Sequence, residues 1–489
     1  MTQVLPALPA APSLSPSSAP EGATQPPQLG FDQLPLAPAT LLNLQQLGYL
    51  RMTPIQAAAL PLALAGQDLI AQAKTGSGKT AAFALTLLTK LNPRRFAVQA
   101  LVLCPTRELA DQVTQEIRRL ARGADNIKVL TLCGGSTMRP QMSSLEHGAH
   151  VVVGTPGRIM DHLQRGSLDL TALDTLVLDE ADRMLDMGFF DDIVTVAKAC
   201  PKQRQTLLFS ATYPEGIASL SRQFLRQPQQ ITLSEQHEAG KIRQRFYEVA
   251  PEQKLAAVGL LLKHYRPVST LAFCNTRQQC RELLQVLRAE GFVALALHGE
   301  LEQRERDQVL VQFANRSCSV LVATDVAARG LDIDQLEAVI NVDVTPDTEV
   351  HVHRIGRTGR VDQAGWAFSL VSGNQMARVD NIEKALGHEI EWHTLSELQP
   401  APGKPLQPPM ATLQILGGRK EKIRPGDVLG ALTGEAGFSK EQIGKINVTD
   451  TSTYVAVARS IAREAVRKLS AGTLKGKRVK VHLLQDRAD

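Results

Sequence analysis

The sequence predicts two consecutive α/β lobes, each built on a doubly wound parallel sheet, followed by a small α+β module. Three observations lead to this fold class. Short apolar runs alternate with helical stretches twice along the chain, which is typical of strands that are buried on both faces of a parallel sheet. A chain of 489 residues is too long for a single core. The last 79 residues instead follow the order β–α–β–β–α–β.

The composition fits a soluble globular protein, with 43% hydrophobic and 21% charged residues. No uncharged apolar run reaches the length of a membrane span, so we expect no membrane partner. The six cysteines are scattered and include no CxxC pair. This spacing argues against a disulfide framework or a zinc site and fits a reducing compartment, so we expect a cytoplasmic protein.

The chain begins with a segment that is not expected to fold. Residues 1–28 are rich in Ala, Pro and Ser, with seven prolines, and cannot bury a core. No Lys or Arg precedes Arg51, so the segment lacks the charged start of a signal or transit peptide. We expect a disordered tail.

The first lobe is expected over residues 29–235. Its apolar runs each end in a polar or Gly/Pro loop, and a doubly wound sheet binds its ligand at the carboxyl ends of its strands. We therefore expect a ligand site where these polar residues gather. The runs are "QDLI" (67–70), "ALVLCP" (100–105), "HVVVGTP" (150–156), "TLVLDEAD" (175–182) and "TLLFSAT" (206–212).

The second lobe is expected over residues 240–394, after the polar linker "SEQHEAGK" (234–241). It repeats the strand pattern but has no phosphate loop of its own. A stiff, proline-rich linker over residues 395–410 then leads to the C-terminal module, residues 411–489. The strand runs of this lobe are "TLAFCNT" (270–276), "VALALHGE" (293–300), "SVLVATDVAARG" (319–330) and "AVINVD" (338–343).

A phosphate-binding loop is predicted at "AQAKTGSGKT" (71–80), between an apolar strand and a helical stretch. The usual pattern is GxxxxGK[ST], in which glycines let backbone N–H groups face the phosphates at a helix N-terminus. The lysine would reach the β- and γ-phosphates, and the threonine would hold Mg2+. The alternative is a Gly/Ser loop that only caps a helix. The candidate residues are Ala73 (in place of the first glycine), Lys74, Thr75, Gly76, Ser77, Gly78, Lys79 and Thr80.

A catalytic pair of carboxylates is predicted where the strand "TLVL" ends in Asp179 and Glu180. Asp179 would hold Mg2+, partly through water, and Glu180 would orient and deprotonate the attacking water. A strand end followed by an acidic helix start is the alternative. The phosphate loop about a hundred residues earlier favours a nucleotide hydrolase.

Three closely spaced arginines in "HRIGRTGR" (353–360) repel one another unless an anion lies among them. We predict that this anion is the γ-phosphate of a nucleotide bound by the first lobe, so that Arg354, Arg357 and Arg360 reach it only when the lobes close. An arginine supplied across a cleft to a phosphoryl group accelerates transfer by about 10³–10⁵ in other nucleotide hydrolases. The alternative is a solvated basic loop.

The order of these motifs resembles that of the DEAD-box ATP-dependent RNA helicases over about residues 31–392. The resemblance implies two RecA-like lobes that use ATP, Mg2+ and RNA, without a DNA partner. Lys74 departs from the family, which usually has an uncharged residue there. The matching stretches are Phe31 with "GYLRMTPIQ" (48–56), "AQAKTGSGKT", "PTRELA" (105–110), "GG" (134–135), "TPGR" (155–158), "DEAD", "SAT" (210–212), "ATDVAARGLD" (323–332) and "HRIGRTGR".

The resemblance also implies roles for individual residues. In the segment 29–57, Gln56 and Phe31 would bind the adenine, and Asp332 would touch the ribose. Arg357 and Arg360 would contact the γ-phosphate. Asp182, Ser210 and Thr212 would couple the site to lobe closure, with His353 and Arg354 at the interlobe contact. Arg107, Gly135, Thr155, Arg158, Thr324 and Gly330 would contact the RNA backbone.

The C-terminal module is basic, with 15 Lys and Arg against 8 Asp and Glu, whereas the rest of the chain has a net charge of −2. A concentrated basic module indicates nucleic-acid binding. Its element order suits an RRM-like sheet with helices on one face, and Ser460 is a candidate N-cap of its second helix. Tyr454 is the one plausible stacking aromatic on its strands and could equally belong to the core. Binding would then depend on Lys477, Arg478, Lys480 and other basic groups.

Two stretches of the module resemble the C-terminal domain of the DbpA-type helicases. They are "KIRPGDVLGALTGEAGFSKEQIGKI" (422–446) and "YVAVARSIAREAVRKL" (454–469). The resemblance implies binding of a structured 23S ribosomal RNA segment, in rRNA or pre-50S particles, during large-subunit assembly. The leading hypothesis is thus an RNA-stimulated ATPase that locally unwinds rRNA.

Two other functions stay open. One is a general mRNA or cold-shock helicase with the module as a non-specific anchor. The other is an RNA clamp or assembly scaffold in which ATP only locks the grip on RNA. The presence of Glu180, Arg357 and Arg360 argues against this alternative, because a clamp has no need of fast hydrolysis.

Overall fold

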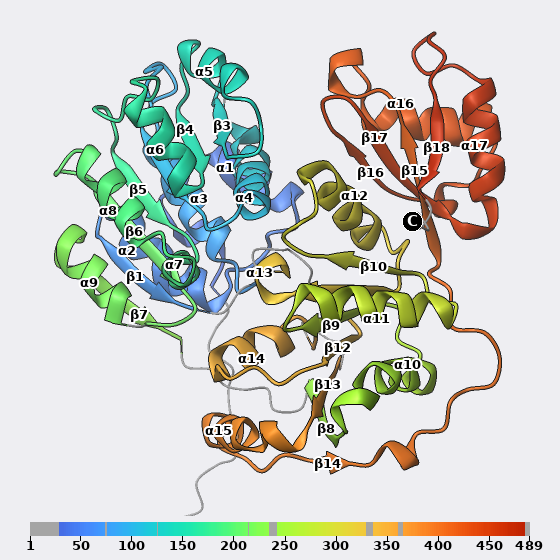
Figure 1. The fold of residues 1–489 in the computed structure, drawn as a ribbon. Coiled ribbons are helices and arrows are strands. Elements are labelled where there is room, and N and C mark those ends of the chain that lie inside the picture. The colour runs from blue at the N-terminus through green and yellow to red at the C-terminus, as the bar shows by residue number, and fades with distance from the viewer. Residues whose placement is uncertain are drawn as a thin grey trace, which may run out of the picture.

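The computed structural model describes residues 29–73, 76–124, 126–213, 215–233, 242–328, 336–359 and 365–484. They form three bodies (Figure 1): lobe 1, lobe 2 and a C-terminal module that lies beside lobe 2. Two seven-stranded parallel sheets and a four-stranded antiparallel sheet confirm the predicted fold class. Within the described residues, no helix combines the length and the apolar character that crossing a membrane requires. The predicted tail, residues 1–28, and the linker 234–241 lie outside the described residues.

Lobe 1 is a parallel sheet in the order β3-β4-β2-β5-β6-β1-β7, with helices on both faces. Its central strands are buried on both faces, as the uninterrupted apolar runs predicted. The strands are β1 (Leu69–Gln72), β2 (Ala100–Leu103), β3 (Val129–Leu132), β4 (Val151–Gly154), β5 (Thr175–Leu178), β6 (Gln205–Ser210) and β7 (Gln229–Thr232). The helices are α1 (Pro38–Gln46), α2 (Pro54–Leu64), α3 (Lys79–Lys90), α4 (Arg107–Leu120), α5 (Met138–Glu146), α6 (Pro156–Gln164), α7 (Ala181–Asp186), α8 (Phe190–Ala199) and α9 (Glu215–Phe224).

Lobe 2 repeats this architecture in the order β10-β11-β9-β12-β13-β8-β14, again with every pairing parallel. The strands are β8 (Ile242–Glu248), β9 (Thr270–Cys274), β10 (Ala294–Leu297), β11 (Val320–Thr324), β12 (Ala338–Asn341), β13 (Gly365–Val371) and β14 (Trp392–His393). The helices are α10 (Lys254–Tyr265), α11 (Arg277–Ala289), α12 (Gln303–Ala314), α13 (Asp325–Ala328), α14 (Thr348–Ile355) and α15 (Met376–Leu386).

The short apolar runs identified the central strands and missed several others. Strand β7 is an edge strand with mostly exposed side chains. Strand β8 lies next to the edge strand β14 of the other sheet, and its first half carries the polar run Arg243, Gln244 and Arg245. Edge strands have one solvated side and lack the uninterrupted apolar run on which the prediction relied. Strands β3, β13 and β14 also had no predicted counterpart.

The module is an antiparallel sheet in the order β16-β17-β15-β18, with two helices on one face. Its helix α17 begins after a short 3₁₀ turn with Ile461 at the N-cap, so the prediction that Ser460 caps this helix was wrong. Tyr454 is only 5% exposed and offers no open ring face to a base. The elements are β15 (Met410–Ile415), α16 (Pro425–Gly430), β16 (Ile443–Val448), β17 (Thr453–Ala458), α17 (Ala462–Ala471) and β18 (Val481–Leu484).

The module is docked onto lobe 2. Thr412 lies on the sheet face opposite the helices and is fully buried, because the loop between α12 and β11 covers it. Asn315 Nδ2 donates to Thr412 Oγ1 over 3.1 Å, and the Ser317 and Thr412 hydroxyls lie 2.6 Å apart. Arg459 reaches back to the Ser317 carbonyl over 3.2 Å. These contacts fix the module relative to lobe 2.

The proline-rich segment before the module also contacts lobe 2. Leu398 is buried in the core of this lobe, and Ala401 N–H donates to the Lys263 carbonyl over 3.2 Å. Gln407 Nε2 donates to the Gly291 carbonyl, likewise over 3.2 Å. The segment therefore contacts lobe 2 at the C-terminal ends of α10 and α11 and is not a free spacer between two bodies.

A buried histidine of lobe 2 generates a prediction about acid stability. His351 is fully buried beside Phe246, and neither ring nitrogen has a hydrogen-bond partner among the described residues. Burial and the neighbouring Arg354 lower its pKa to about 4. Since an unfolded chain protonates this ring near pH 6.5, the free energy of unfolding falls as the pH drops from about 6.5 to about 4.

We expect His351→Gln to remove up to about 3 kcal/mol of this pH dependence. Both tryptophans of the chain, Trp366 and Trp392, lie in lobe 2, so their fluorescence reports its unfolding in denaturant. The exposed His388→Gln is the control and should leave the pH dependence unchanged. An unaltered pH profile in His351→Gln would contradict the assignment.

Candidate functional site

Three strands of lobe 1 bring the predicted nucleotide site together. Strands β5, β6 and β1 are consecutive neighbours in a parallel sheet, so their carboxyl ends meet at one edge. The phosphate loop follows β1, the acidic pair follows β5, and "SAT" (210–212) follows β6. The sheet order therefore gathers segments that are far apart in the sequence.

The phosphate loop has the backbone geometry that its glycines predict. Gly76 and Gly78 have φ angles of +77° and +96°, which favour glycine, and Gly78 is the N-cap of α3. Lys79 is 5% exposed, and its Nζ donates to the Ala73 carbonyl over 2.7 Å. The hydroxyl of Ser77 is buried and has no hydrogen-bond partner among the described residues. Thr80 follows in the first turn of α3, whereas Lys74 and Thr75 lie outside the described residues.

The expected adenine-binding residues are buried against this loop. Gln56 is 1% exposed and forms a capping box with Thr53 at the start of α2. Its Nε2 also donates to the Gly78 carbonyl over 3.1 Å, which ties the segment 29–57 to the phosphate loop. Phe31 is 4% exposed, with its ring edge-to-face against Tyr49 at 6.3 Å.

The acidic pair lies at a sharp turn between β5 and α7. Asp179 is 2% exposed, and burial raises its pKa to about 7 against the opposing effect of Lys79. Glu180 has a left-handed φ of +50°, which is uncommon for a side chain of this kind and is typical of functional sites. Its carboxylate forms a buried ion pair of 3.0 Å with Arg183, on the first turns of α7.

These groups suit a magnesium ion. A buried carboxylate with a raised pKa favours a cation as its partner, and Asp179 and Thr80 supply the hard oxygen ligands that Mg2+ prefers. Mg2+ usually keeps several of its waters and binds substrate phosphates, so it needs few protein ligands. The described part of the chain contains no group of three or more His, Cys, Asp and Glu side chains that could hold a metal ion.

Asp182 joins the acidic turn to "SAT". Its Oδ2 accepts from the Ala211 and Thr212 N–H groups over 3.0 and 2.9 Å and from the Thr212 hydroxyl over 3.1 Å. Its own N–H donates to Ser210 Oγ over 3.3 Å. Burial tends to raise the pKa of Asp182, but the Thr212 hydrogen bond and the nearby Lys79 lower it, so the carboxylate stays ionised.

Lobe 2 faces these carboxylates with the end of α14. His353 lies close to Asp182 and Glu180, and burial together with Arg183 lowers its pKa to about 4, so the imidazole is neutral at about pH 7. Arg357 follows the helix and is 6% exposed. A small hollow between the lobes is lined by Arg183 and Asp186 of lobe 1 and by Phe273, Asp325, Ala328, Val350, His353, Arg354 and Arg357 of lobe 2. Asp332 and Arg360 lie outside the described residues.

Arg354 departs from the expectation that all three arginines meet one phosphate. Its Nε and Nη2 donate to the two Asp325 carboxylate oxygens, each over 2.6 Å. It also donates to Asn341, Asn275 and the Asp343 carbonyl, and it is 2% exposed. Although Arg354 lines the interlobe hollow, its anion is a carboxylate of its own lobe.

Four of the expected RNA-contacting residues meet at one edge of lobe 1. The Arg107 guanidinium lies over Gly134 and Gly135, so close that a Cβ on Gly135 would fall 1.6 Å from Nη1. Arg158 donates to the Ser136 carbonyl over 3.2 Å, and Thr155 precedes it at the N-cap of α6. On lobe 2, Thr324 ends β11, whereas Gly330 lies outside the described residues.

Sequence inspection missed a direct contact between the lobes beside this edge. Arg107 Nη1 donates to Gln303 Oε1 over 2.8 Å, and Arg306 pairs with Glu108 over 2.5 Å. Both contacts join the first turn of α4 to the first turns of α12 (Figure 1). Each side chain looks like an ordinary solvated group of a helix start, so only the distant partner reveals its role.

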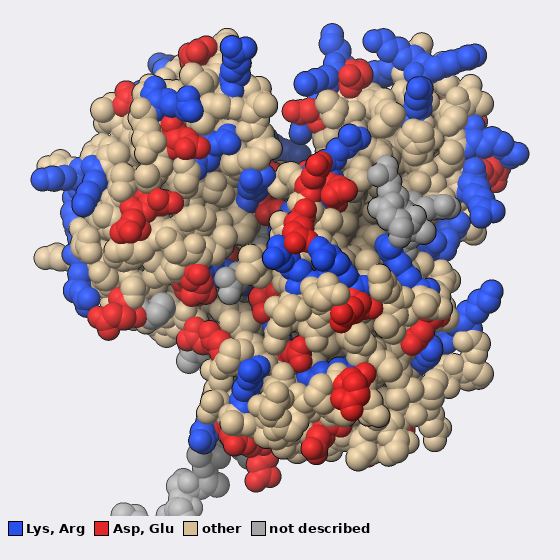
Figure 2. Space-filling model, in the orientation of Figure 1, with Lys and Arg blue, Asp and Glu red and all other residues tan. Residues whose placement is uncertain are grey.

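The module carries an exposed basic pocket, which we call the module pocket. It is a hollow of about 560 Å3 that is lined by both basic and apolar side chains. Lys477, Arg478 and Lys480, for which RNA binding is predicted, lie on the neighbouring segment before β18 and are exposed. Figure 2 shows Lys and Arg side chains gathered on the outer surface of the module. The pocket is lined by Arg419, Lys422, Ile423, Arg424, Pro425, Val448 and Lys475.

Three protein families match successive parts of the chain. Residues 53–220 match the family described as DEAD/DEAH box helicase, and residues 253–362 match the helicase conserved C-terminal domain. Residues 412–483 match the DbpA RNA binding domain. The matches coincide with lobe 1, lobe 2 and the module in turn.

Known proteins resemble the chain over most of its length. The ATP-dependent RNA helicase DbpA of Escherichia coli is 52% identical over 452 residues, which cover 92% of this chain and 98% of the relative. The DEAD-box ATP-dependent RNA helicase CshA of Geobacillus kaustophilus is 40% identical, covering 74% and 77%. Among solved structures, S. cerevisiae Dbp5 bound to RNA and ADP BeF3 has a TM-score of 0.70 at 32% identity, covering 75% of this chain and 96% of that one.

The contact between Gly135 and Arg107 predicts a selective defect. In Gly135→Ala the new methyl group displaces the Arg107 guanidinium. If Arg107 binds an RNA phosphate, as the family resemblance implies, this displacement removes a charge-assisted hydrogen bond of about 1.5–3 kcal/mol. We expect the half-saturating RNA concentration in ATPase assays to rise at least about tenfold, with ATP affinity in the absence of RNA unchanged.

Gly166→Ala is the matched control. Gly166 has a similar φ of +65°, but no atom lies within 4 Å of the added Cβ, so this variant carries the backbone strain without the displacement. An equal shift in both variants would show that strain alone, and not the position of Arg107, causes the defect.

Proposed function

The chain belongs to the DbpA-type DEAD-box ATP-dependent RNA helicases, and from this premise we propose that it binds structured 23S ribosomal RNA through its module. It unwinds neighbouring RNA helices during assembly of the large ribosomal subunit, which takes place in the cytoplasm. The observation that carries the proposal is the module itself, a basic RNA-binding domain held at a fixed position beside the two helicase lobes. A fixed anchor suits one defined RNA target.

The nucleotide end of the proposal rests on the strand ends of lobe 1. Lys79 and the α3 N-terminus bind the β- and γ-phosphates of ATP, and Gln56 and Phe31 bind the adenine. Asp179 and Thr80 hold Mg2+, which neutralises developing charge on the phosphates when it is bound. Glu180 orients the attacking water and accepts its proton. Its buried position and ion pair with Arg183 hold the carboxylate in one orientation.

Lobe closure completes the site. Asp182 fixes "SAT" next to the acidic turn, and His353 of lobe 2 lies close to Asp182. A movement of Asp182 therefore changes the electrostatic environment of His353. Arg357, together with Arg360 and Asp332 of the segments that lie outside the described residues, then contacts the γ-phosphate and the ribose. Because these groups come from the other lobe, hydrolysis requires both lobes together.

RNA lies across both lobes on the side where α4 meets α12. Arg107, Arg158, Thr155 and the backbone at Gly135 form one cluster on lobe 1, with Thr324 and Gly330 on lobe 2. These groups suit contacts to the sugar–phosphate backbone, which carry no sequence information. Sequence selection must therefore come from elsewhere on the chain.

The module pocket and its neighbours supply that selection. The sheet face that RRM-type domains use for stacking is partly covered here, with Thr412 under lobe 2 and Tyr454 buried. The module pocket stays open and combines four cations with three apolar residues, which suits a phosphate and an unstacked base. Lys477, Arg478 and Lys480 extend this basic surface.

Two variants of lobe 1 separate ATP binding from hydrolysis. Lys79→Ala removes a charge from the phosphates and should weaken ATP binding. Glu180→Gln keeps the shape but removes the proton acceptor, so ATP should bind and hold the protein in a closed, RNA-bound state with turnover lowered at least about 10²-fold.

Equilibrium ATP binding and single-turnover hydrolysis measure the two effects. Glu215→Gln, at a solvated position of the same lobe, is the control and should behave as wild type. Near-normal turnover in Glu180→Gln would overturn the assignment of the base.

Charge reversal at the module pocket tests RNA selection. Because the module is docked on lobe 2, deleting it would expose buried surface, so substitutions are the cleaner test. Lys422→Glu/Arg424→Glu should raise the half-saturating concentration of 23S rRNA at least about tenfold and lower the salt dependence by about two phosphate contacts. Stimulation by poly(A) should hardly change.

Arg463→Glu/Arg467→Glu makes the same change of charge on the exposed face of α17 and should leave selection intact. Equal half-saturation of the wild type by 23S rRNA and poly(A) would instead favour a general RNA helicase. A 23S preference that survives in the pocket variant would place selection in the lobes.

A further inference from the structure

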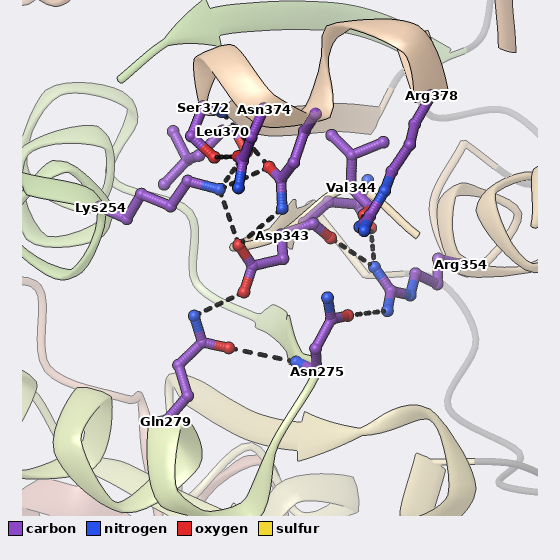
Figure 3. A network of polar contacts seen from close by, with 12 residues as sticks. Lys254, Asn275, Gln279, Asp343, Val344, Arg354, Leu370, Ser372, Asn374 and Arg378 are labelled. Atoms are coloured by element: carbon purple, nitrogen blue, oxygen red, sulfur yellow. Dashed lines mark hydrogen bonds and ion pairs between the residues drawn. The ribbon is translucent and has the colours of Figure 1, made fainter. Parts of the chain in front are cut away.

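A buried polar network in lobe 2 lies behind the arginine-bearing end of α14 (Figure 3). Lys254, at the start of α10, is 3% exposed and uses all three of its ammonium protons. Its Nζ donates to Asp343 Oδ1 and Gln375 Oε1, each over 2.7 Å, and to the Leu370 carbonyl over 3.1 Å. Every donor of this buried cation therefore has an acceptor.

Asp343 is the centre of the network. Its carboxylate accepts from Lys254, from Gln375 Nε2 over 3.1 Å, and from Gln279 Nε2 over 2.6 Å. The backbone carbonyl of the same residue accepts from Arg354 Nη1 over 2.9 Å. A displacement of Asp343 therefore moves an acceptor of Arg354.

A second path reaches the same arginine. Gln279 Oε1 accepts from the Asn275 N–H over 3.1 Å, and the Asn275 side-chain oxygen accepts from Arg354 Nη2 over 3.3 Å. Arg354 is in the last turn of α14, and its carbonyl accepts from the Arg357 N–H over 3.2 Å. The network thus fixes the side chain of Arg354, and the backbone carbonyl of Arg354 in turn accepts a hydrogen bond from the Arg357 N–H.

Stability alone does not account for this arrangement. Burying an ion pair costs desolvation energy that apolar side chains of similar volume avoid, and replacing such pairs by apolar residues is often neutral or stabilising. What apolar side chains cannot supply is the set of directional hydrogen bonds that fixes a guanidinium. A displacement of about 1 Å at a reacting group can lower a rate about 10²-fold.

We propose that Lys254, Asp343 and Gln279 are positioning residues that align Arg357 with the nucleotide phosphate when the lobes close. The inference rests on the proposed function, in which Arg357 contacts the γ-phosphate. None of the three lines the interlobe hollow, whereas Arg354 and Arg357 do, so the three act through Arg354 and the end of α14.

The test is the RNA-stimulated ATPase of the full chain, measured as kcat and as half-saturation for ATP and RNA. Lys254→Met should lower kcat about 10- to 100-fold and leave both half-saturation values within about twofold. Lys263→Met is the matched control, because Lys263 lies on the same helix and pairs with Glu290, without a path to Arg354. It should keep the wild-type kcat.

A double variant separates positioning from folding. Lys254→Met/Asp343→Leu replaces the buried pair by apolar side chains. The midpoint temperature of thermal unfolding, followed by tryptophan fluorescence, should therefore be higher than in Lys254→Met. If kcat recovers along with it, the network is merely structural and the proposal is overturned. Continued loss of kcat in a stable protein supports positioning.

A complementary exchange tests the hydrogen bonds themselves. Asp343→Asn turns a donor toward the Gln279 amide and should lower kcat. Adding Gln279→Glu to this variant supplies a carboxylate that accepts both from the new side-chain amide at position 343 and from the Asn275 N–H. We expect Asp343→Asn/Gln279→Glu to regain at least about tenfold of the lost kcat. Absence of any rescue would overturn the proposed path through Gln279.

The same assay distinguishes this inference from the function on which it rests. Arg357→Ala should by itself lower kcat about 10²-fold or more. If it does not, the role of Arg357 is wrong. If it does, Lys254→Met should have no further effect in the Arg357→Ala background. An equal additional loss there would show that Lys254 acts by another route.

Discussion

The buried Asp182 carboxylate is the group on which the nucleotide end of the molecule depends. Strands β5 and β6 are neighbours, but the loops that follow them have different functions. Asp182 is the common hydrogen-bond acceptor that holds the acidic turn next to "SAT". Three donors from "SAT" and the N–H of Arg183 converge on this one carboxylate. Leaving such a buried charge unpaired would be costly, so the two loops are held together or move together.

In lobe 2 the strand ends are connected by a buried cation, Arg354, where lobe 1 uses the Asp182 carboxylate. Arg354 gathers the ends of β9, β11 and β12, because its partners Asn275, Asp325 and Asn341 follow or end these strands. Each lobe therefore uses a buried ion to connect strand ends: Asp182 in lobe 1, next to the hollow-lining Arg183, and Arg354 in lobe 2, which itself lines the interlobe hollow. Arg357 and His353 also line this hollow on the side of lobe 2.

How much of the site could be predicted from the sequence depends on how far apart in the chain the interacting residues lie. The phosphate loop and the acidic pair are local patterns whose chemistry lies in adjacent residues, so they could be recognised directly. Arg354 and Arg357 look alike in sequence, and only the sheet order shows that Asp325 takes the first of them. Thr412 looks like any outward strand residue, and its burial depends on where a second domain docks. When the partner of a residue is determined by tertiary contacts, the residue's own place in the sequence does not reveal that partner.

Docking of the module changes how RNA recognition and unwinding are connected. A flexible tether raises the local RNA concentration near the lobes but allows many orientations. Here the hydrogen bonds from Asn315 and Ser317 to Thr412, with the proline-rich segment along lobe 2, hold the module at one place. If the module pocket binds an RNA element, as we propose, the flanking duplex of that element would be presented to the lobes at a fixed distance and angle. Selection would then be geometric as well as chemical, because a duplex at another distance from the module pocket would not reach the lobes.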